Sequence, residues 1–296
     1  MTATAAPMIP RTPVAKLRVV LEMIKIEHTL FALPFAFLGA TLAAGGVPSV
    51  RQTVLICTAM VGARSAAMAF NRLVDREYDA KNPRTANRAI PAGLLSVPFV
   101  AVFTVASSVL LIVASALLNP LALVLSPVAL GLVLFYSLTK RFTAWSHAWL
   151  GIALSVAPIG AWVAVRGSLT DTTPFLLGAA VVCWLIGFDI IYALQDVGFD
   201  KGAGLHSVPA RYGATKALII GRVAHVAMIG FLVLTGLAAH LGAWYFAGVA
   251  LAALLIGIEH AIISPADLKR LNIAFFHVNI AVSLGLLVFT LLDIFL

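Results

Sequence analysis

NRLVDREYDAKNPRTANR, residues 71–88, places eight charged side chains within eighteen residues of an otherwise apolar chain. The complete sequence of 296 residues holds 20 Lys and Arg and 12 Asp and Glu, so this stretch carries a quarter of the charge. Hydrophobic residues make up 61% of the chain, and the mean hydropathy is +1.03. A water-soluble protein of this size could not bury that much apolar surface, so the sequence predicts an integral membrane protein.

Apolar runs long enough to cross a bilayer occur nine times along the sequence. They lie at roughly 22–45, 50–70, 95–117, 121–138, 145–165, 174–195, 216–239, 241–262 and 272–295. We therefore expect an all-α membrane protein whose nine transmembrane helices form one domain (residues 22–296). A cytoplasmic N-terminal arm (residues 1–21) would precede it.

The basic residues are distributed unevenly between the two sides of these runs. Eighteen of the 20 Lys and Arg residues fall near the N-terminus or in alternate connections, and only Arg51 and Arg166 fall in the others. Cytoplasmic loops carry such an excess of Lys and Arg, so the N-terminus is expected in the cytoplasm and the C-terminus outside. Because this topology accounts for the net charge of +8, we expect a lipid bilayer and no nucleic acid as the partner.

Two clusters of acidic residues follow the second and the sixth apolar runs. Asn71, Asp75 and Asp79 are spaced four apart, so they would share one face of a continuing helix. The second cluster repeats this spacing with Tyr192, Asp196 and Asp200. Two four-helix halves followed by a ninth helix would place both clusters on the same membrane face, across a central cavity.

The composition of the clusters indicates a metal and a phosphate-bearing ligand. Carboxylates stacked four residues apart repel each other unless a cation lies between them, and ligand sets made only of oxygen favour Mg²⁺. Together with the basic residues Arg72, Lys140 and Arg141, the carboxylates indicate a diphosphate held by Mg²⁺ and cationic side chains. The alternative is that these charges are solvated loop residues. For the acids this alternative is weak, because Asp and Glu contribute little to membrane topology.

NRLVDREYD (71–79) and DIIYALQDVGFDKGAGLHSVPARYG (189–213) resemble the two signatures of the UbiA superfamily of intramembrane aromatic prenyltransferases. Further segments that resemble the family are NPRTANRAIPAG (82–93), YSLTKRFT (136–143) and LNIAFFHVN (271–279). The resemblance therefore extends over nearly the whole chain.

This resemblance implies a nine-helix UbiA-type fold and Mg²⁺-dependent transfer of a polyprenyl chain from its diphosphate to an aromatic acid. Lys140 and Arg141 match the basic pair that helps to hold the diphosphate. Arg72 departs from the family pattern, in which Asp commonly follows the motif Asn, and this leaves the number of protein ligands to the metal open. Carried over by position, the ligands of the Mg²⁺–diphosphate would be Asn71, Asp75, Asp79, Asp196 and Asp200.

Two features of the motifs indicate the identity of the aromatic acceptor. The Asn-Arg pair that opens the first motif and LQDVGFDKGAGLHS (194–207) are similar to the bacterial 4-hydroxybenzoate polyprenyltransferases of quinone biosynthesis. The resemblance thus implies 4-hydroxybenzoate as the acceptor and the bacterial cytoplasmic membrane as the location. A dihydroxynaphthoate acceptor, for menaquinone, stays open.

Polar residues deeper in the apolar runs are candidates for binding the acceptor. Arg64 lies seven residues before Asn71 and on its face, where it would contact the acceptor carboxylate or the diphosphate, or extend to the membrane surface. Asp189 lies seven residues before Asp196. It would orient or deprotonate the acceptor hydroxyl, stabilise a prenyl cation, or pair with Arg64. Tyr192 offers that cation a hydroxyl or a ring face, or is a plain core aromatic.

Two other classes of membrane protein also combine acidic residues with apolar helices. An ion-coupled transporter could use the paired clusters, but such sites favour the membrane midplane and interrupted helices. An alcohol phosphatidyltransferase also carries spaced aspartates, but its single Asp-Gly-x₂-Ala-Arg signature is absent here. The prenyltransferase interpretation explains both clusters.

Overall fold

The computed structural model describes residues 12–25, 29–263 and 273–296. Three parts of the expectations above lie outside these residues. They are most of the N-terminal arm (1–11), a short part of the first predicted helix (26–28) and the stretch before the last helix (264–272).

Within the described ranges, all regular secondary structure is helical. The helices are α1 (Pro13–Met23), α2 (Thr29–Ala44), α3 (Val50–Val74), α4 (Arg76–Lys81), α5 (Val97–Leu118), α6 (Pro120–Thr139), α7 (Ser146–Arg166), α8 (Thr173–Ala193), η2 (Leu194–Asp196), α9 (Val197–Gly202), α10 (Val208–Tyr212), α11 (Ala214–Ala238), α12 (Ala243–Ile262), η3 (Ile273–Val278) and α13 (Asn279–Phe295). Of these, η2 is a 3₁₀-helix and η3 is a turn of π-helix.

Eight helices in the described part of the chain are long and apolar enough to cross a membrane. They are α3, α5, α6, α7, α8, α11, α12 and the helix that ends in α13. The helix α2 is also apolar but shorter. The predicted all-α membrane fold is confirmed, and the eight spanning helices together with α2 correspond to the nine predicted segments.

The first predicted segment, 22–45, differs most from the structure. It is divided, because α1 ends at Met23 and α2 begins only at Thr29. Lys25 adopts a left-handed backbone conformation (φ 52°), which cannot continue a right-handed helix. The helix α1 packs through Val20 and Met23 on Ala69 of α3, so this part of the predicted arm is attached to the helical bundle.

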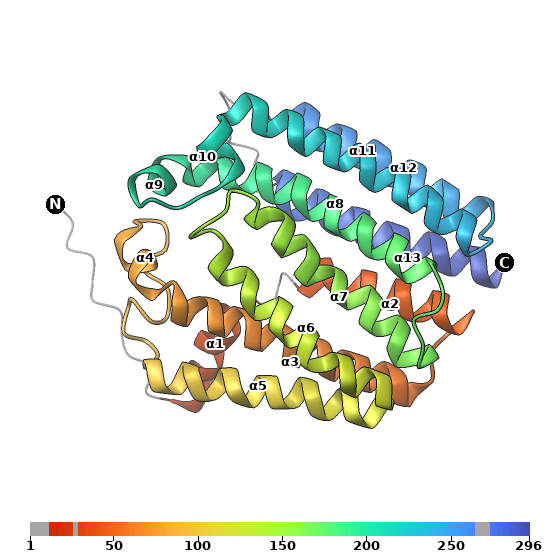
Figure 1. Cartoon of the computed structure of the whole chain (residues 1–296), viewed down its shortest axis with the longest axis horizontal. Coiled ribbons are helices and arrows are strands. Elements are labelled where there is room, and N and C mark those ends of the chain that lie inside the picture. Colours follow the sequence, from red (N-terminus) through yellow and green to blue (C-terminus); the bar gives the residue numbers. More distant parts are fainter. Residues whose placement is uncertain (1–11, 26–28, 264–272) are drawn as a thin grey trace.

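The long helices run side by side, and their connections collect at the two ends of the bundle (Figure 1). The short helices α4, α9 and α10 lie at one end of the bundle, and the C-terminus lies at the opposite end (Figure 1). Because α4 follows α3 and α9 follows α8, the two charged motifs come to the same end of the bundle. At that end, α3 is followed by Asp75 and then by the short helix α4. The helix α8 is followed by the 3₁₀-helix η2 and then by the short helix α9.

Candidate active site

The first motif keeps its three polar residues on one face despite a break in the helix. The helix α3 ends at Val74, and α4 begins at Arg76 after Asp75. The backbone N–H of Asp75 still donates to the carbonyl of Asn71 (3.0 Å), and that of Asp79 donates to the carbonyl of Asp75 (2.8 Å). The side-chain amide of Asn71 also donates to Asp75 Oδ2 (3.1 Å). The spacing of four therefore survives in three dimensions.

Asp75 is buried and binds the basic pair at the end of α6. Lys140 Nζ lies 2.7 Å from Asp75 Oδ2, and Arg141 Nη2 lies 3.3 Å from Oδ1. Arg141 also donates to the carbonyl of Val74 (2.6 Å) and lies over the ring of Tyr78, 5.5 Å from its centroid. The sequence separates these groups by more than sixty residues, and the fold joins them into one ionic cluster.

Asp79 is the second buried carboxylate of the first motif. Arg88 Nη1 binds its Oδ1 at 2.7 Å, and Arg72 Nη1 lies 3.9 Å from its Oδ2. The hydroxyl of Thr85 donates to the Asp79 backbone carbonyl (3.0 Å). Oδ2 is buried and accepts no hydrogen bond from the residues that the structure describes. A buried oxygen of this kind is costly unless it gains a partner, so Asp79 has a free ligand position.

The second motif is tied to the first by Arg84. The Arg84 Nε and Nη2 atoms lie 2.9 and 2.6 Å from the two carboxylate oxygens of Asp196. Arg84 also lies over the ring of Tyr192, 5.8 Å from its centroid, and its Nη1 donates to the Tyr192 hydroxyl at 3.4 Å. Burial lowers the pKa of Arg84, but the hydrogen bonds and the charge of Asp196 outweigh this, so the pKa lies above its ordinary value. Asp200 accepts a hydrogen bond from the hydroxyl of Ser207 (2.9 Å).

A cavity of about 640 Å³ opens next to these motifs and extends into the apolar part of the bundle. Its charged lining residues are Lys25, Arg64, Arg72, Arg88 and Asp189, and Tyr192 also lines it. Most of the remaining lining is aliphatic and comes mainly from α3, α6 and α7. A cavity of this kind suits a long apolar ligand with a charged head group.

The structure places Arg64 and Asp189 on the wall of this cavity but gives them different partners. Arg64 Nη2 donates to the backbone carbonyl of Lys25 (3.0 Å). Asp189 Oδ2 lies 2.7 Å from Nδ1 of His147, which is buried at the start of α7. Among the described residues, the ionic partner of Asp189 is therefore His147 rather than Arg64.

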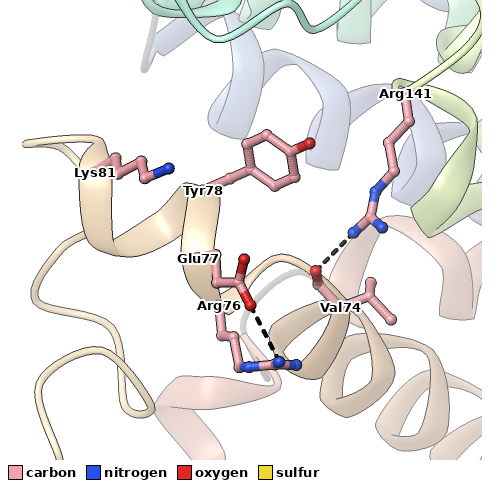
Figure 2. Close-up of a pocket in the computed structure, with 6 residues that line it drawn as sticks. All are labelled: Val74, Arg76, Glu77, Tyr78, Lys81 and Arg141. Carbon is pink, nitrogen blue, oxygen red and sulfur yellow. Dashed lines mark hydrogen bonds and ion pairs between the residues drawn. The ribbon is translucent and has the colours of Figure 1, made fainter.

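A second, smaller hollow of about 420 Å³ is lined by residues of the first motif and by Arg141. Figure 2 shows its six lining residues, with Arg76 paired to Glu77 and the Arg141 side chain reaching the Val74 carbonyl. Arg141 thus contributes both to this hollow and to the ion pair with Asp75. The hollow opens beside the site at the charged end of the bundle.

The donor set of the two motifs fits a hard cation. It consists of Asn71, Asp75, Asp79, Asp196 and Asp200, which offer only oxygen ligands, and oxygen ligands are typical of Mg²⁺. Each of the four carboxylates is held by a cationic side chain or a hydroxyl, and the described residues contain no preformed group of three metal-ligating side chains. The buried Oδ2 of Asp79, which accepts no hydrogen bond from the described residues, is a direct structural sign of an available ligand position.

Four residues of the site were missed as site residues by the sequence analysis. Arg84, Arg88, His147 and Ser207 bind Asp196, Asp79, Asp189 and Asp200 respectively. Arg84 and Arg88 are four residues apart in the charged opening stretch, and this spacing was a usable signal. For His147 and Ser207 the sequence held no comparable pattern.

Comparison with known proteins identifies the family. Residues 32–280 match the UbiA prenyltransferase family. The chain belongs to the UbiA prenyltransferase family. It is 36% identical over 227 residues to the mitochondrial 4-hydroxybenzoate polyprenyltransferase of Arabidopsis thaliana, a match that covers 76% of this chain and 54%, about half, of the plant protein. It is 33% identical over 242 residues to a 4-hydroxybenzoate octaprenyltransferase of Nitrosospira multiformis, covering 81% of this chain and 82% of that one.

Solved structures of UbiA homologues share the fold. The apo structure of a homologue from Aeropyrum pernix K1 aligns with a TM-score of 0.83 at 36% identity, covering 90% of this chain and 98% of the other. A homologue from Archaeoglobus fulgidus, bound to GPP and Mg²⁺, aligns with a TM-score of 0.68 at 18% identity, covering 94% and 100%. The chain is thus a multi-pass membrane prenyltransferase of the UbiA family.

Proposed function

We propose that this UbiA-family enzyme transfers a polyprenyl chain from polyprenyl diphosphate to an aromatic acid, 4-hydroxybenzoate, in an Mg²⁺-dependent reaction of quinone biosynthesis. The observation that carries the proposal is the position of two carboxylate motifs, with their cationic partners, beside a long apolar cavity. Relatives named for 4-hydroxybenzoate support the acceptor, and the Archaeoglobus homologue with GPP and Mg²⁺ supports the donor and the metal.

In this proposal the prenyl tail lies in the aliphatic part of the cavity and the diphosphate lies at the two motifs. Cleavage of the allylic C–O bond leaves a carbocation and pyrophosphate, so the barrier depends on how well the departing negative charge is stabilised. Asn71 and the four aspartates would hold Mg²⁺, which when bound supplies positive charge to the diphosphate oxygens. The basic side chains that pair with these carboxylates would also contact the diphosphate. They are Arg72, Arg84, Arg88, Lys140 and Arg141.

The acceptor would bind where the cavity is lined by Arg64, Asp189 and Tyr192. The guanidinium of Arg64 can hold the acceptor carboxylate by two parallel hydrogen bonds. Asp189 would orient the acceptor hydroxyl or take up the proton that leaves the ring when the new C–C bond forms. The hydroxyl and ring of Tyr192 would face the cation, which is protected from water by the aliphatic walls.

A dihydroxynaphthoate is the second candidate acceptor. It too is an aromatic acid with a ring hydroxyl, so the same Arg64 and Asp189 contacts would serve it. The transporter and phosphatidyltransferase interpretations are set aside by membership of a prenyltransferase family. We further propose that the enzyme lies in the bacterial cytoplasmic membrane with its N-terminus in the cytoplasm, as the distribution of Lys and Arg indicates.

The test is transfer by the purified protein in lipid nanodiscs. A polyprenyl diphosphate and Mg²⁺ would be combined with 4-hydroxybenzoate or with 1,4-dihydroxy-2-naphthoate. Pyrophosphate release would then be measured, and the products would be identified by mass spectrometry. Release that depends on 4-hydroxybenzoate, with a prenylated product, supports the proposal. A product formed only from the naphthoate would support dihydroxynaphthoate, the second candidate, as the acceptor. No product from either acid contradicts both.

A further inference from the structure

The histidine that binds Asp189 is held in one orientation and one tautomer. His147 is buried (2% exposed) in the first turn of α7. Its Nε2 lies 3.3 Å from the backbone nitrogen of Val208, and its Nδ1 lies 2.7 Å from Asp189 Oδ2. A backbone N–H can only donate, so Nε2 must be the acceptor, and the ring proton of a neutral imidazole must be on Nδ1. The imidazole therefore donates a hydrogen bond through its Nδ1–H to the Asp189 carboxylate.

This contact leaves one oxygen of Asp189 available to a ligand. Oδ2 binds His147, whereas Oδ1 has no hydrogen-bond partner among the residues that the structure describes. The side chain of Asp189 is 23% exposed, and the residue lines the large cavity. With Oδ2 held, the carboxylate cannot rotate freely, and the direction of Oδ1 is fixed.

The partner of His147 belongs to a three-residue segment that contacts several parts of the site. His206 N–H donates to the carbonyl of Lys140 (2.7 Å), whose ammonium binds Asp75. The Ser207 hydroxyl donates to Asp200 (2.9 Å), and the next N–H, that of Val208, donates to His147. The segment is fixed locally, because the Ser207 hydroxyl also accepts from the Ala210 N–H at the start of α10. The segment 206–208 thus links the proposed diphosphate site to the proposed acceptor site.

We infer that His147 is a positioning residue for prenyl transfer, which the segment 206–208 holds in place and which aims the Asp189 carboxylate at the aromatic acceptor. This inference rests on the proposed function, because it assigns Asp189 a role toward that acceptor. His147 itself does not touch substrate. A misplaced Asp189 would still be present and charged, but its free oxygen would no longer meet the acceptor.

Two substitutions separate this role from simple packing. In His147→Gln, the amide oxygen can accept from the Val208 N–H while the amide nitrogen donates to Asp189, so both bonds can be retained. His147→Leu keeps an apolar side chain of similar bulk and makes neither bond. We expect His147→Leu to lower kcat by about 10- to 100-fold, the size of effect that a shift of about 1 Å in a reacting group produces. His147→Gln should restore most of the rate.

The kinetic pattern distinguishes positioning from loss of structure. The KM for prenyl diphosphate should stay within about 3-fold in both variants, because Asp200 and Lys140 keep their own partners. Asp189→Asn combined with His147→Leu should be no slower than Asp189→Asn alone, because the two residues act as one unit. A matched control is His225→Leu, which removes a second buried histidine that binds the Trp184 carbonyl, outside the site. This control should lower the melting temperature and leave kcat per folded molecule unchanged.

A spectroscopic measurement checks the tautomer independently of activity. In ¹⁵N-histidine spectra of the protein in nanodiscs, the signals that disappear in His147→Gln should show a protonated Nδ1 and an unprotonated Nε2. A protonated Nε2 would overturn the inference. So would an active wild type in which His147→Leu turns over at the wild-type rate, or a double variant with fully additive losses. A wild type that prenylates no aromatic acid would overturn the proposed function, and the inference with it.

Discussion

Arg84 holds Asp196 by two parallel hydrogen bonds across 112 residues of sequence, with Nε and Nη2 at 2.9 and 2.6 Å from the two carboxylate oxygens. This pair is the direct ionic link between the loop after the first motif and the second motif. Both side chains are partly exposed, at 37% and 19%. Exposed ion pairs contribute little to stability, so the geometry of this one matters more for the site than for the fold.

The first prediction follows from this link. Arg84→Ala is expected to lower kcat/KM for the prenyl diphosphate by about 10- to 150-fold, the equivalent of one or two charge-assisted hydrogen bonds of about 1.5–3 kcal/mol in all. The kcat/KM of Arg84→Lys should lie between those of the wild type and of Arg84→Ala, because a lysine keeps the charge but cannot make two parallel hydrogen bonds. Arg18→Ala, at an exposed arginine of α1 that pairs with Glu22, is the control and should leave kcat/KM unchanged. Equal kcat/KM in all three variants would remove Arg84 from the site.

Metal dependence gives the second prediction. Chelation by EDTA should abolish transfer and added Mg²⁺ should restore it, and Asp75→Asn should lower the rate by several orders of magnitude. The fold should survive this substitution, because the Lys140 and Arg141 side chains are 32% and 34% exposed and stay hydrated when Asp75 is lost. The melting temperature measures folding, and pyrophosphate release measures the reaction. Turnover of a well-folded Asp75→Asn variant near the wild-type rate would contradict the role of this carboxylate.

The third prediction concerns the side of the membrane on which the loops lie. Single cysteines at Ala86 and Ala203, in a background that lacks Cys57 and Cys183, should react with an impermeant maleimide only from the cytoplasmic side. A cysteine at Ser168 should react only from outside, because the positive-inside distribution of charge and the connection between α7 and α8 place it there. Labelling of Ala86 and Ala203 from opposite sides would be incompatible with the Arg84–Asp196 link.

Close helix packing is the basis of the fourth prediction. A Cβ at Gly39 of α2 would lie 2.9 Å from the Pro158 Cα of α7 and would overlap the Pro158 carbonyl oxygen, so Gly39→Ala must push the two helices apart. Such overpacking typically costs about 1–3 kcal/mol. Gly230→Ala in α11 is the matched control, since no atom lies within 4 Å of its Cβ position. The melting temperature should fall for Gly39→Ala and stay level or rise for Gly230→Ala. A fall of the same size in both variants would contradict the role of the close contact between Gly39 and Pro158, because Gly→Ala without a steric overlap favours a helix.

The sequence predicted the helices better than the contacts between them. The segment predicted at 145–165 is α7 at Ser146–Arg166, because a membrane-spanning helix needs an uninterrupted apolar run, and such a run is visible locally. The break near Lys25 was missed, since a single left-handed residue leaves no mark in hydropathy.

The partners of the motif residues depend on long-range packing. Spacing alone placed Asn71, Asp75 and Asp79 on one face, and the backbone hydrogen bonds retain that face. Nothing in the spacing could assign Arg84 to Asp196 or His147 to Asp189, because these pairs are 112 and 42 residues apart and form only when the helices assemble. Pairing Asp189 with Arg64 was a reasonable hypothesis from depth in the membrane, but position along two helices does not determine which side chains meet.

The last prediction concerns Arg64, which lines the cavity and donates to the Lys25 carbonyl through Nη2. A guanidinium can hold a carboxylate by two parallel hydrogen bonds, which a lysine ammonium cannot reproduce. Arg64→Lys is therefore expected to raise the KM for the aromatic acid by about 10- to 150-fold, the equivalent of losing one charge-assisted hydrogen bond, and to change the KM for prenyl diphosphate much less. Steady-state kinetics with each substrate varied in turn would measure both.

Arg51→Lys, the same exchange at the opposite end of α3, is the control and should change neither KM. The three outcomes for Arg64→Lys lead to different conclusions. A rise in the acceptor KM places the aromatic carboxylate against Arg64. If the KM for prenyl diphosphate rises instead, Arg64 belongs with Arg72 and Arg88 at the diphosphate. If neither changes, Arg64 has a structural role, to which its contact with the Lys25 carbonyl belongs, and the acceptor carboxylate must be bound by another cation.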